Sequence, residues 1–127
     1  MKPSKKIKIG NTIVSKNHPA YIIAEIGSNH NNDLITAKKL IKEASKCGVN
    51  AVKFQTFRAS EHYSKYSPGF NYLKNKSTFD LIKSLEINRE WQPILKKYSE
   101  QLNIDFFSSP CDVEAVDQLK KIFKANP

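Results

Sequence analysis

Polar side chains that can take part in chemistry stand at the ends of three short apolar runs. The runs read YIIAEIGSNH at 21–30, NAVKFQTF at 50–57 and IDFFSSPCD at 104–112. Because side chains alternate between the two faces of a strand, each run offers one apolar face to covering helices and a polar tip on the other face. The polar tips are Glu25, Lys53, Gln55 and Ser109, and Asn29 and His30 lie in the loop after the first run.

These residue types suit a phosphate or carboxylate ligand. Lys53 supplies a point charge, and the N-termini of helices that follow the strands supply free N–H donors. Glu25 can orient a hydroxyl or a water, or act as an acid or base. Gln55 offers both a donor and an acceptor to a sugar-like hydroxyl. The sequence therefore predicts an anion-binding site, with Glu25 and Lys53 as its catalytic candidates.

Each candidate also has a purely structural interpretation. Lys53 can extend to solvent, although its place inside the apolar run AVKFQ favours function, and Glu25 can simply be its ion-pair partner. Gln55 can be structural, and Ser109 can be a turn or cap residue. His30 can be an ordinary loop histidine or a metal ligand, but no second ligand has suitable spacing, so we predict no metal ligand in this chain.

The elements that must position these residues alternate between strand and helix. A β-hairpin is predicted at 7–14 around Gly10-Asn11, and strands at 20–26, 49–56 and 104–108. Helices are predicted at 33–47, within 88–102 and from about Asp112, where apolar residues recur at helical spacing. This order predicts an α/β fold with about three βα units on a parallel sheet. In such folds the chemistry sits at the carboxyl ends of the strands.

The details of the helices are also predicted. Asp33 and Gly48 are the expected caps of the first helix, and Pro93 is expected in the first turn of the second, where a missing N–H costs least. The stripes expected to be buried are Trp91, Ile94, Leu95, Tyr98 and Leu102, and then Val113, Val116, Leu119, Ile122 and Phe123. Residues 57–77 are predicted to be an insert on the active-site side, followed by a short helix near 78–85.

The composition narrows the class of protein. The net charge is +9, from 21 basic and 12 acidic residues among 127, but eight of the lysines fall within the expected amphipathic helices, so nucleic-acid binding is not predicted. The two cysteines, Cys47 and Cys111, suit a reducing compartment. No signal peptide and no membrane-spanning run is recognisable. These features predict a cytoplasmic protein that binds no membrane.

Three stretches of the sequence resemble the sialic acid synthase family, which comprises N-acetylneuraminate synthases and related pseudaminic, legionaminic and spore-coat polysaccharide enzymes. IAEIGSNHNNDLITAKKLIKEASKCGVNAVKFQTF is similar to the opening of the family. FFSSPCDVEAVDQL is similar to its third-strand segment, usually read as F-S-T-P-F-D, and SLEINREWQPILKKYSEQLNIDFFSSP follows the family's order. The resemblance extends over residues 7–124.

The resemblance implies a (β/α)₈ TIM barrel that condenses phosphoenolpyruvate with an N-acetylhexosamine-type aldehyde. The products would be a nine-carbon 2-keto sugar acid and phosphate. A barrel of this type needs about 250 residues, so residues 1–127 are expected to form the N-terminal part of the barrel domain only, without the family's C-terminal antifreeze-like domain. The complete enzyme is expected to be a homodimer that uses a divalent metal, Mn or Mg, with its ligands beyond this chain.

The resemblance also implies residue roles. Lys53 would hold phosphoenolpyruvate, helped by Ser109, and Gln55 would contact the acceptor, an N-acetylated amino sugar. Glu25 would sit beside the reacting centre and orient a hydroxyl or water. Asn29 and His30 would shape the first loop of the substrate site.

Three positions depart from the family pattern: Asn32 replaces a glycine, Ser109 a threonine and Cys111 a phenylalanine. Asparagine tolerates positive φ, and Ser109 keeps the hydroxyl. Two other functions remain open at this stage. One is another phosphoenolpyruvate-dependent 3-deoxy-keto-acid synthase, and the other is a non-catalytic fragment or assembly module that pairs with a complementary half-barrel.

Overall fold

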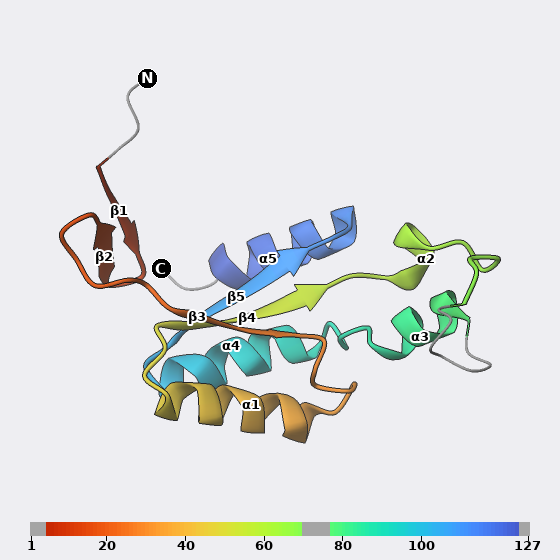
Figure 1. The fold of residues 1–127 in the computed structure, drawn as a ribbon, viewed down its shortest axis with the longest axis horizontal. Coiled ribbons are helices and arrows are strands. Elements are labelled where there is room, and N and C mark those ends of the chain that lie inside the picture. The colour runs from red at the N-terminus through yellow and green to blue at the C-terminus, as the bar shows by residue number, and fades with distance from the viewer. Residues whose placement is uncertain (1–4, 70–76, 125–127) are drawn as a thin grey trace.

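A three-stranded parallel sheet forms the centre of the chain in the computed structural model, which describes residues 5–69 and 77–124 (Figure 1). Its strands are β3 (Ile23–Gly27), β4 (Ala51–Thr56) and β5 (Asp105–Pro110), in the order β3-β4-β5. The parallel pairing confirms the predicted βα units, because parallel neighbours need a crossover connection between them.

The predicted hairpin is confirmed at the amino end of the sheet. β1 (Lys6–Ile9) pairs antiparallel with β2 (Thr12–Ser15). Gly10 lies at the turn with φ of +52°, a value that glycine adopts without steric cost. In Figure 1 the hairpin projects from the end of the molecule opposite the arrowheads of β4 and β5.

Three long helices follow the strands: α1 (Leu34–Lys46), α4 (Trp91–Gln101) and α5 (Val113–Lys124). Asp33 caps α1 as predicted, since its carboxylate accepts hydrogen bonds from the backbone N–H groups of Ile35 and Thr36. Gly48, with φ of +75°, follows the C-cap residue Cys47. Pro93 is the third residue of α4, so its missing N–H falls in the first turn as predicted.

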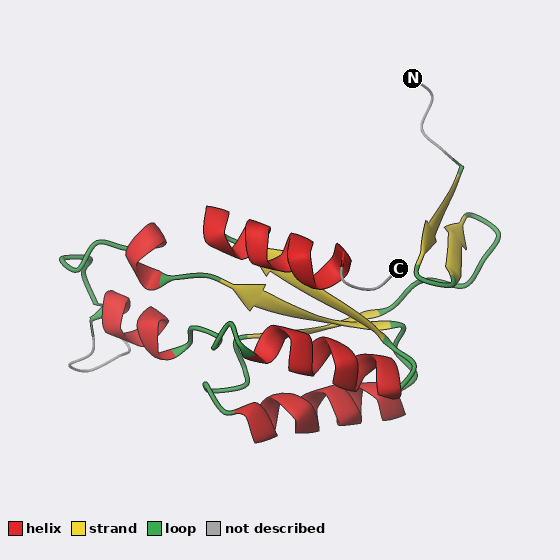
Figure 2. Cartoon of the chain, turned by 180° about the vertical axis from the view of Figure 1, so that it is seen from behind, coloured by secondary structure: helices red, strands yellow, loops and turns green. Residues whose placement is uncertain are grey.

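The three helices cover one face of the sheet. Phe54 and Phe106, from β4 and β5, stack with ring centroids 5.6 Å apart and pack with Ile41 of α1 and Leu95 of α4. The ring of Phe123 reaches Phe106 from α5, at 6.4 Å between centroids. Figure 2 shows α1 and α4 side by side along the sheet. None of the described helices covers the opposite face, although at its amino end the hairpin turn at Gly10 lies against Asp105 of β5.

The predicted stripes are wrong at three positions. Ile94, Val113 and Phe123 are 42%, 79% and 42% exposed, respectively. α5 turns Ala115 and Leu119 toward the core instead, so its buried stripe is rotated relative to the prediction. Both cysteines are also exposed.

The insert after β4 contains two short helices, α2 (Ala59–His62) and α3 (Thr78–Ser84). The second confirms the predicted helix near 78–85, while α2 was not predicted. Part of the predicted insert, residues 70–76, lies outside the described residues. Both helices sit beyond the carboxyl end of β4 (Figures 1 and 2), which is where the insert was expected.

The third strand is longer than predicted. It continues through Ser109 to Pro110, which pairs with Thr56 of β4. Ser109 is therefore a strand residue and not a turn residue. Among the described residues, no helix is both long and apolar enough to cross a membrane.

Candidate active site

The uncovered face of the sheet carries the predicted polar residues in register. Glu25 of β3 pairs with Lys53 of β4, and Lys53 pairs in turn with Phe107 of β5. One step nearer the carboxyl end, Gln55 pairs with Ser109. Because these positions alternate with core residues along each strand, the four predicted polar tips share one face of three adjacent strands.

Glu25 and Lys53 form an ion pair. The Lys53 Nζ lies 2.5 Å from Glu25 Oε2, and the two side chains remain 34% and 49% exposed, respectively. The structure thus confirms that Glu25 is the charge partner of Lys53. Because both side chains stay accessible, an incoming anion can compete with Glu25 for the ammonium group.

A bulge in β3 brings Gln55 close to this pair. The pairing shifts between Glu25 and Gly27, so that Gly27 stands opposite Phe54. A Cβ atom at Gly27 would lie 3.4 Å from Glu25 Oε1 and 3.8 Å from Gln55 Oε1. The carboxylate and the amide therefore converge over the bare backbone of Gly27, a site where glycine permits close approach.

The loop between β3 and α1 is stabilised by Asn29 and by the backbone conformation of the two residues after His30. The Asn29 side chain donates to the Ile26 carbonyl at 3.0 Å and is itself exposed at the end of the strand. Asn31 and Asn32 adopt φ of +49° and +53°. The expectation that Asn32 can replace a glycine is thus confirmed.

His30 does not join the other site residues. Its side chain is fully buried among the core residues, with ring centroids 6.1 Å from Phe54 and 6.2 Å from Trp91. Its Nδ1 accepts the Asn32 N–H at 3.0 Å, and burial lowers the pKa of the imidazole. The loop turns back after Asn29, so the ring enters the helix-covered side and supports the loop from below.

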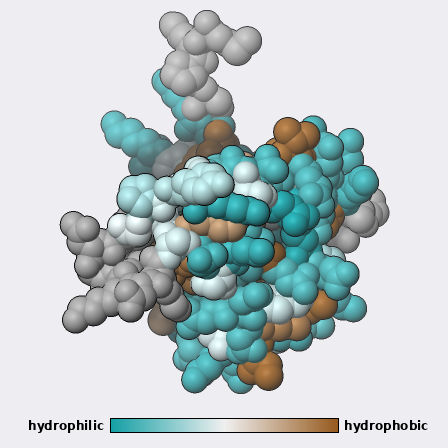
Figure 3. All heavy atoms as spheres, turned by 90° about the vertical axis from the view of Figure 1, so that its right-hand side faces the viewer, coloured by the Kyte–Doolittle hydropathy of each residue, from teal (hydrophilic) through white to brown (hydrophobic). Residues whose placement is uncertain are grey.

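A hollow of about 390 Å³ opens beside Gln55 at the carboxyl end of the sheet. Ser28, Phe57 and Cys111 line it together with residues of the insert, which are His62, Tyr63, Ile82 and Leu85. Figure 3 looks onto this end of the molecule and shows apolar atoms set back among a mostly hydrophilic surface. Sequence reasoning did not select Ser28, Phe57 or Tyr63, although Ser28 and Phe57 lie next to the polar tips in the sequence.

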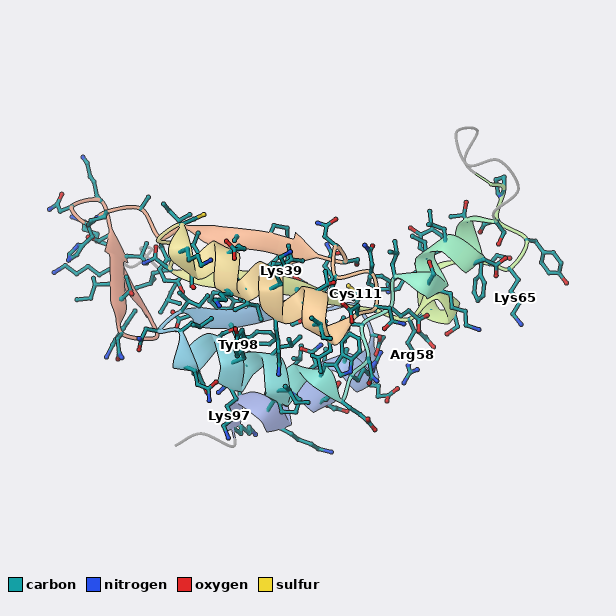
Figure 4. All side chains as sticks on the ribbon, turned by 90° about the horizontal axis from the view of Figure 1, so that it is seen from below. Lys39, Arg58, Lys65, Lys97, Tyr98 and Cys111 are labelled. Atoms are coloured by element: carbon teal, nitrogen blue, oxygen red, sulfur yellow. The ribbon has the colours of Figure 1, made fainter. Side chains whose placement is uncertain are left out.

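A charged network fixes the loop after β5 behind this hollow. Arg89 Nη2 contacts Asp112 Oδ2 at 2.5 Å, and both side chains are nearly buried, at 12% and 7% exposed. Burial raises the pKa of Asp112, but the hydrogen bonds from Arg89 and from the Ala115 N–H outweigh it, so the net shift is downward. Arg58, labelled with Cys111 in Figure 4, adds a second arginine by pairing with Glu114 at 2.9 Å. The network was not predicted.

The NeuB family profile matches residues 40–125, which is more than half of the chain. The chain belongs to the NeuB family. This confirms the resemblance recognised in the sequence motifs, since NeuB relatives include named sialic, legionaminic and pseudaminic acid synthases.

Two NeuB relatives show how much of the family the chain spans. Spore coat polysaccharide biosynthesis protein SpsE of Bacillus subtilis is 39% identical over 116 residues, which cover 89% of this chain and 31% of SpsE. N,N'-diacetyllegionaminic acid synthase of Legionella pneumophila is 38% identical over 104 residues, covering 78% of this chain and 29% of the synthase. The chain thus spans about a third of the length of these curated relatives.

A solved NeuB-type structure shares the fold. The N-acetylneuraminic acid synthetase of Leptospira borgpetersenii, crystallised with citrate, superimposes with a TM-score of 0.79 at 36% identity. The match covers 94% of this chain and 39% of the synthetase. The fold is therefore the N-terminal part of a TIM barrel, with β3, β4 and β5 as three of the barrel strands.

Proposed function

We propose that the complete protein containing this chain condenses phosphoenolpyruvate with an N-acetylhexosamine-type aldehyde. The products are a nonulosonic, sialic-type acid and phosphate. Membership of the NeuB family and the names of the relatives support the reaction class. The observation that carries the proposal is the exposed Lys53–Glu25 pair on the uncovered face of the sheet, one step below Gln55 and Ser109.

The reaction makes one C–C bond. C3 of phosphoenolpyruvate attacks the aldehyde carbon, water supplies the new oxygen at C2, and phosphate departs. Lys53 holds the phosphoenolpyruvate anion by charge, and the Ser109 hydroxyl donates a hydrogen bond to it. Glu25 orients the hydroxyl or water next to the reacting carbons, and Gln55 binds a hydroxyl of the amino sugar.

A divalent metal would act as a Lewis acid on the aldehyde in such a reaction. Residues 5–69 and 77–124 contain no group of three or more His, Cys, Asp or Glu side chains able to hold a metal ion. The side chains of these described residues therefore do not form a metal centre by themselves. The roles given above to Lys53, Glu25, Gln55 and Ser109 do not depend on one.

The test is phosphoenolpyruvate consumption by the complete protein with Mn²⁺ and N-acetylmannosamine or related N-acetylated sugars. Lys53→Ala should raise KM for phosphoenolpyruvate about 10- to 100-fold, the equivalent of one hydrogen bond to a charged group. Lys39→Ala is the matched control, because Lys39 is exposed on α1 (Figure 4) and its loss changes the net charge equally.

The outcomes separate the competing functions. Consumption with N-acetylated sugars that depends on Lys53 supports the proposal. Consumption only with aldoses that lack the N-acetyl group indicates another phosphoenolpyruvate-dependent synthase. If the folded wild-type protein consumes no phosphoenolpyruvate with any of these acceptors, the function is that of a non-catalytic module.

A further inference from the structure

Three polar side chains, two of them buried and one half-buried, meet on the helix-covered face behind the proposed site. Gln92, in the first turn of α4, is fully buried, and its Nε2 donates to Thr56 Oγ1 at the end of β4. Thr56 Oγ1 lies 2.6 Å from Ser108 Oγ of β5. Gln92, Thr56 and Ser108, here called the Gln92 cluster, thus join one helix to the carboxyl ends of two strands.

The Gln92 cluster lies on the opposite face of the sheet from two of the proposed substrate-binding residues, on the same strands. Thr56 directly follows Gln55 and Ser108 directly precedes Ser109. Since neighbouring strand residues face opposite ways, fixing Thr56 and Ser108 beneath the sheet sets the direction of Gln55 and Ser109 above it. A backbone hydrogen bond also joins the two strand ends, because the Cys111 N–H donates to the Thr56 carbonyl at 2.9 Å.

Stability alone does not account for Gln92. Its Oε1 is buried and has no hydrogen-bond partner among the described residues, and an unpaired buried carbonyl destabilises a fold. An apolar side chain of similar length would fill the same space without that cost. Ser99 offers the contrast, since it is also buried on α4 but its hydroxyl donates within its own helix, to the Leu95 carbonyl at 2.9 Å.

We propose that Gln92 is a positioning residue that aligns the carboxyl ends of β4 and β5. It holds Thr56, and through Thr56 it holds Ser108, so that Gln55 and Ser109 face one substrate together. The structural part of this inference rests on the contacts of the Gln92 cluster. Its consequence for phosphoenolpyruvate rests on the proposed function.

The test compares Gln92→Met with Ser99→Ala in the complete protein. Gln92→Met keeps the length and removes the amide. We expect its Tm to stay close to that of the wild type and the Cys111 amide hydrogen to exchange with solvent faster. KM for phosphoenolpyruvate should rise about tenfold, with a smaller change in kcat, because a small displacement of binding groups is costly. Ser99→Ala should leave both the exchange and KM unchanged.

Thr56→Val is a second variant that removes the same bond from the strand side, and it should change exchange and KM in the same direction. Wild-type exchange at Cys111 together with wild-type KM in folded Gln92→Met would overturn the inference. If the wild-type protein does not consume phosphoenolpyruvate, the proposed function fails. The exchange rates of the two variants then still decide whether Gln92 aligns the strand ends.

Discussion

The Lys53 ammonium group has two possible partners on the uncovered face, the Glu25 carboxylate and an anionic substrate. Ion pairs between accessible side chains contribute only about 0–1 kcal/mol to stability, and both side chains here keep a third or more of their surface exposed. The pair therefore does little for the fold. It keeps a lysine beside a carboxylate one step below Gln55, which is the arrangement that the proposed anion-binding site needs.

His30 leads to a prediction about pH. Burial lowers its pKa below the ordinary value of 6.5, so the unfolded chain binds the proton more readily than the folded chain does. The stabilising contribution is complete above about pH 6.5 and declines as the pH falls toward the folded pKa. Protonation also removes the lone pair with which Nδ1 accepts the Asn32 N–H.

We expect the complete protein to lose free energy of unfolding between about pH 7.5 and 5.5, and His30→Gln to lose less over the same interval. Urea denaturation at the two pH values measures this difference. His18→Gln is the control, because His18 is exposed at the end of the hairpin, and it should keep the wild-type difference. Equal losses in His30→Gln and the wild type would show that the buried imidazole does not control this pH dependence.

At the scale of elements, alternation along the strands was enough to place Glu25, Lys53 and Gln55 on one face. Ser109 joins them because β5 continues beyond its predicted end. The same reasoning could not place His30, because the direction of a loop side chain depends on the turn that follows it, here through Asn31 and Asn32 at positive φ.

Gln92 also escaped prediction. A polar residue inside an amphipathic helix looks like a solvent-facing one until its partners on other elements are known. Thr56, which bonds Gln92, and Ser108, which bonds Thr56, are 36 and 16 residues away from Gln92 in the sequence. Periodicity predicts which residue types face a core, but it carries no information about contacts over such separations.

The bulge at Gly27 in β3 predicts how an added methyl group would affect the stability of the fold and the proposed site. Gly27 has φ of +56° and leaves space beside Glu25 Oε1, whereas Gly48, with φ of +75°, has nothing within 4 Å of an added Cβ. An alanine at either position adopts the left-handed region at a cost of about 1–2 kcal/mol. Only the alanine at position 27 also meets the carboxylate of the site.

We therefore expect Gly27→Ala and Gly48→Ala to lower the free energy of unfolding by similar amounts, about 1–2 kcal/mol. Only Gly27→Ala should also lower kcat/KM for phosphoenolpyruvate, because its methyl group would take the space beside the Glu25 carboxylate, 3.4 Å from Oε1. Denaturation and steady-state kinetics of the two variants of the complete protein separate the effects. A loss of activity of equal size in Gly48→Ala would mean that backbone strain, and not contact with Glu25, is responsible.

At the scale of the whole molecule, most of the net charge of +9 lies away from the proposed site. Lys39 and Lys97, labelled in Figure 4, belong to α1 and α4, the helices that cover the other face of the sheet. Lys38 lies over the ring of Tyr98, with Nζ 5.5 Å from the centroid. The lysines thus coat the helices. On the uncovered face, the positive charge of Lys53 is already balanced by Glu25.

That balance decides what the described part of the barrel can do alone. Phosphoenolpyruvate carries a carboxylate and a phosphate group, and the phosphate alone bears about two negative charges at neutral pH. A single lysine that is paired with a carboxylate cannot neutralise this ligand. TIM-barrel sites collect their residues from the carboxyl ends of several strands, and three of these strands, β3, β4 and β5, are present in the described residues.

Purified residues 1–127 are therefore expected to consume no phosphoenolpyruvate with Mn²⁺ and N-acetylated sugars, while the complete barrel does. Adding the remaining part of the barrel as a separate polypeptide should restore consumption if it pairs with the open edges of β3 and β5, because unpaired strand edges readily accept new strands. Lys53→Ala in residues 1–127 is the control, since it should lower the restored activity at limiting phosphoenolpyruvate without preventing association. Turnover by residues 1–127 alone would mean that the four polar residues of the uncovered face suffice to bind and activate the donor.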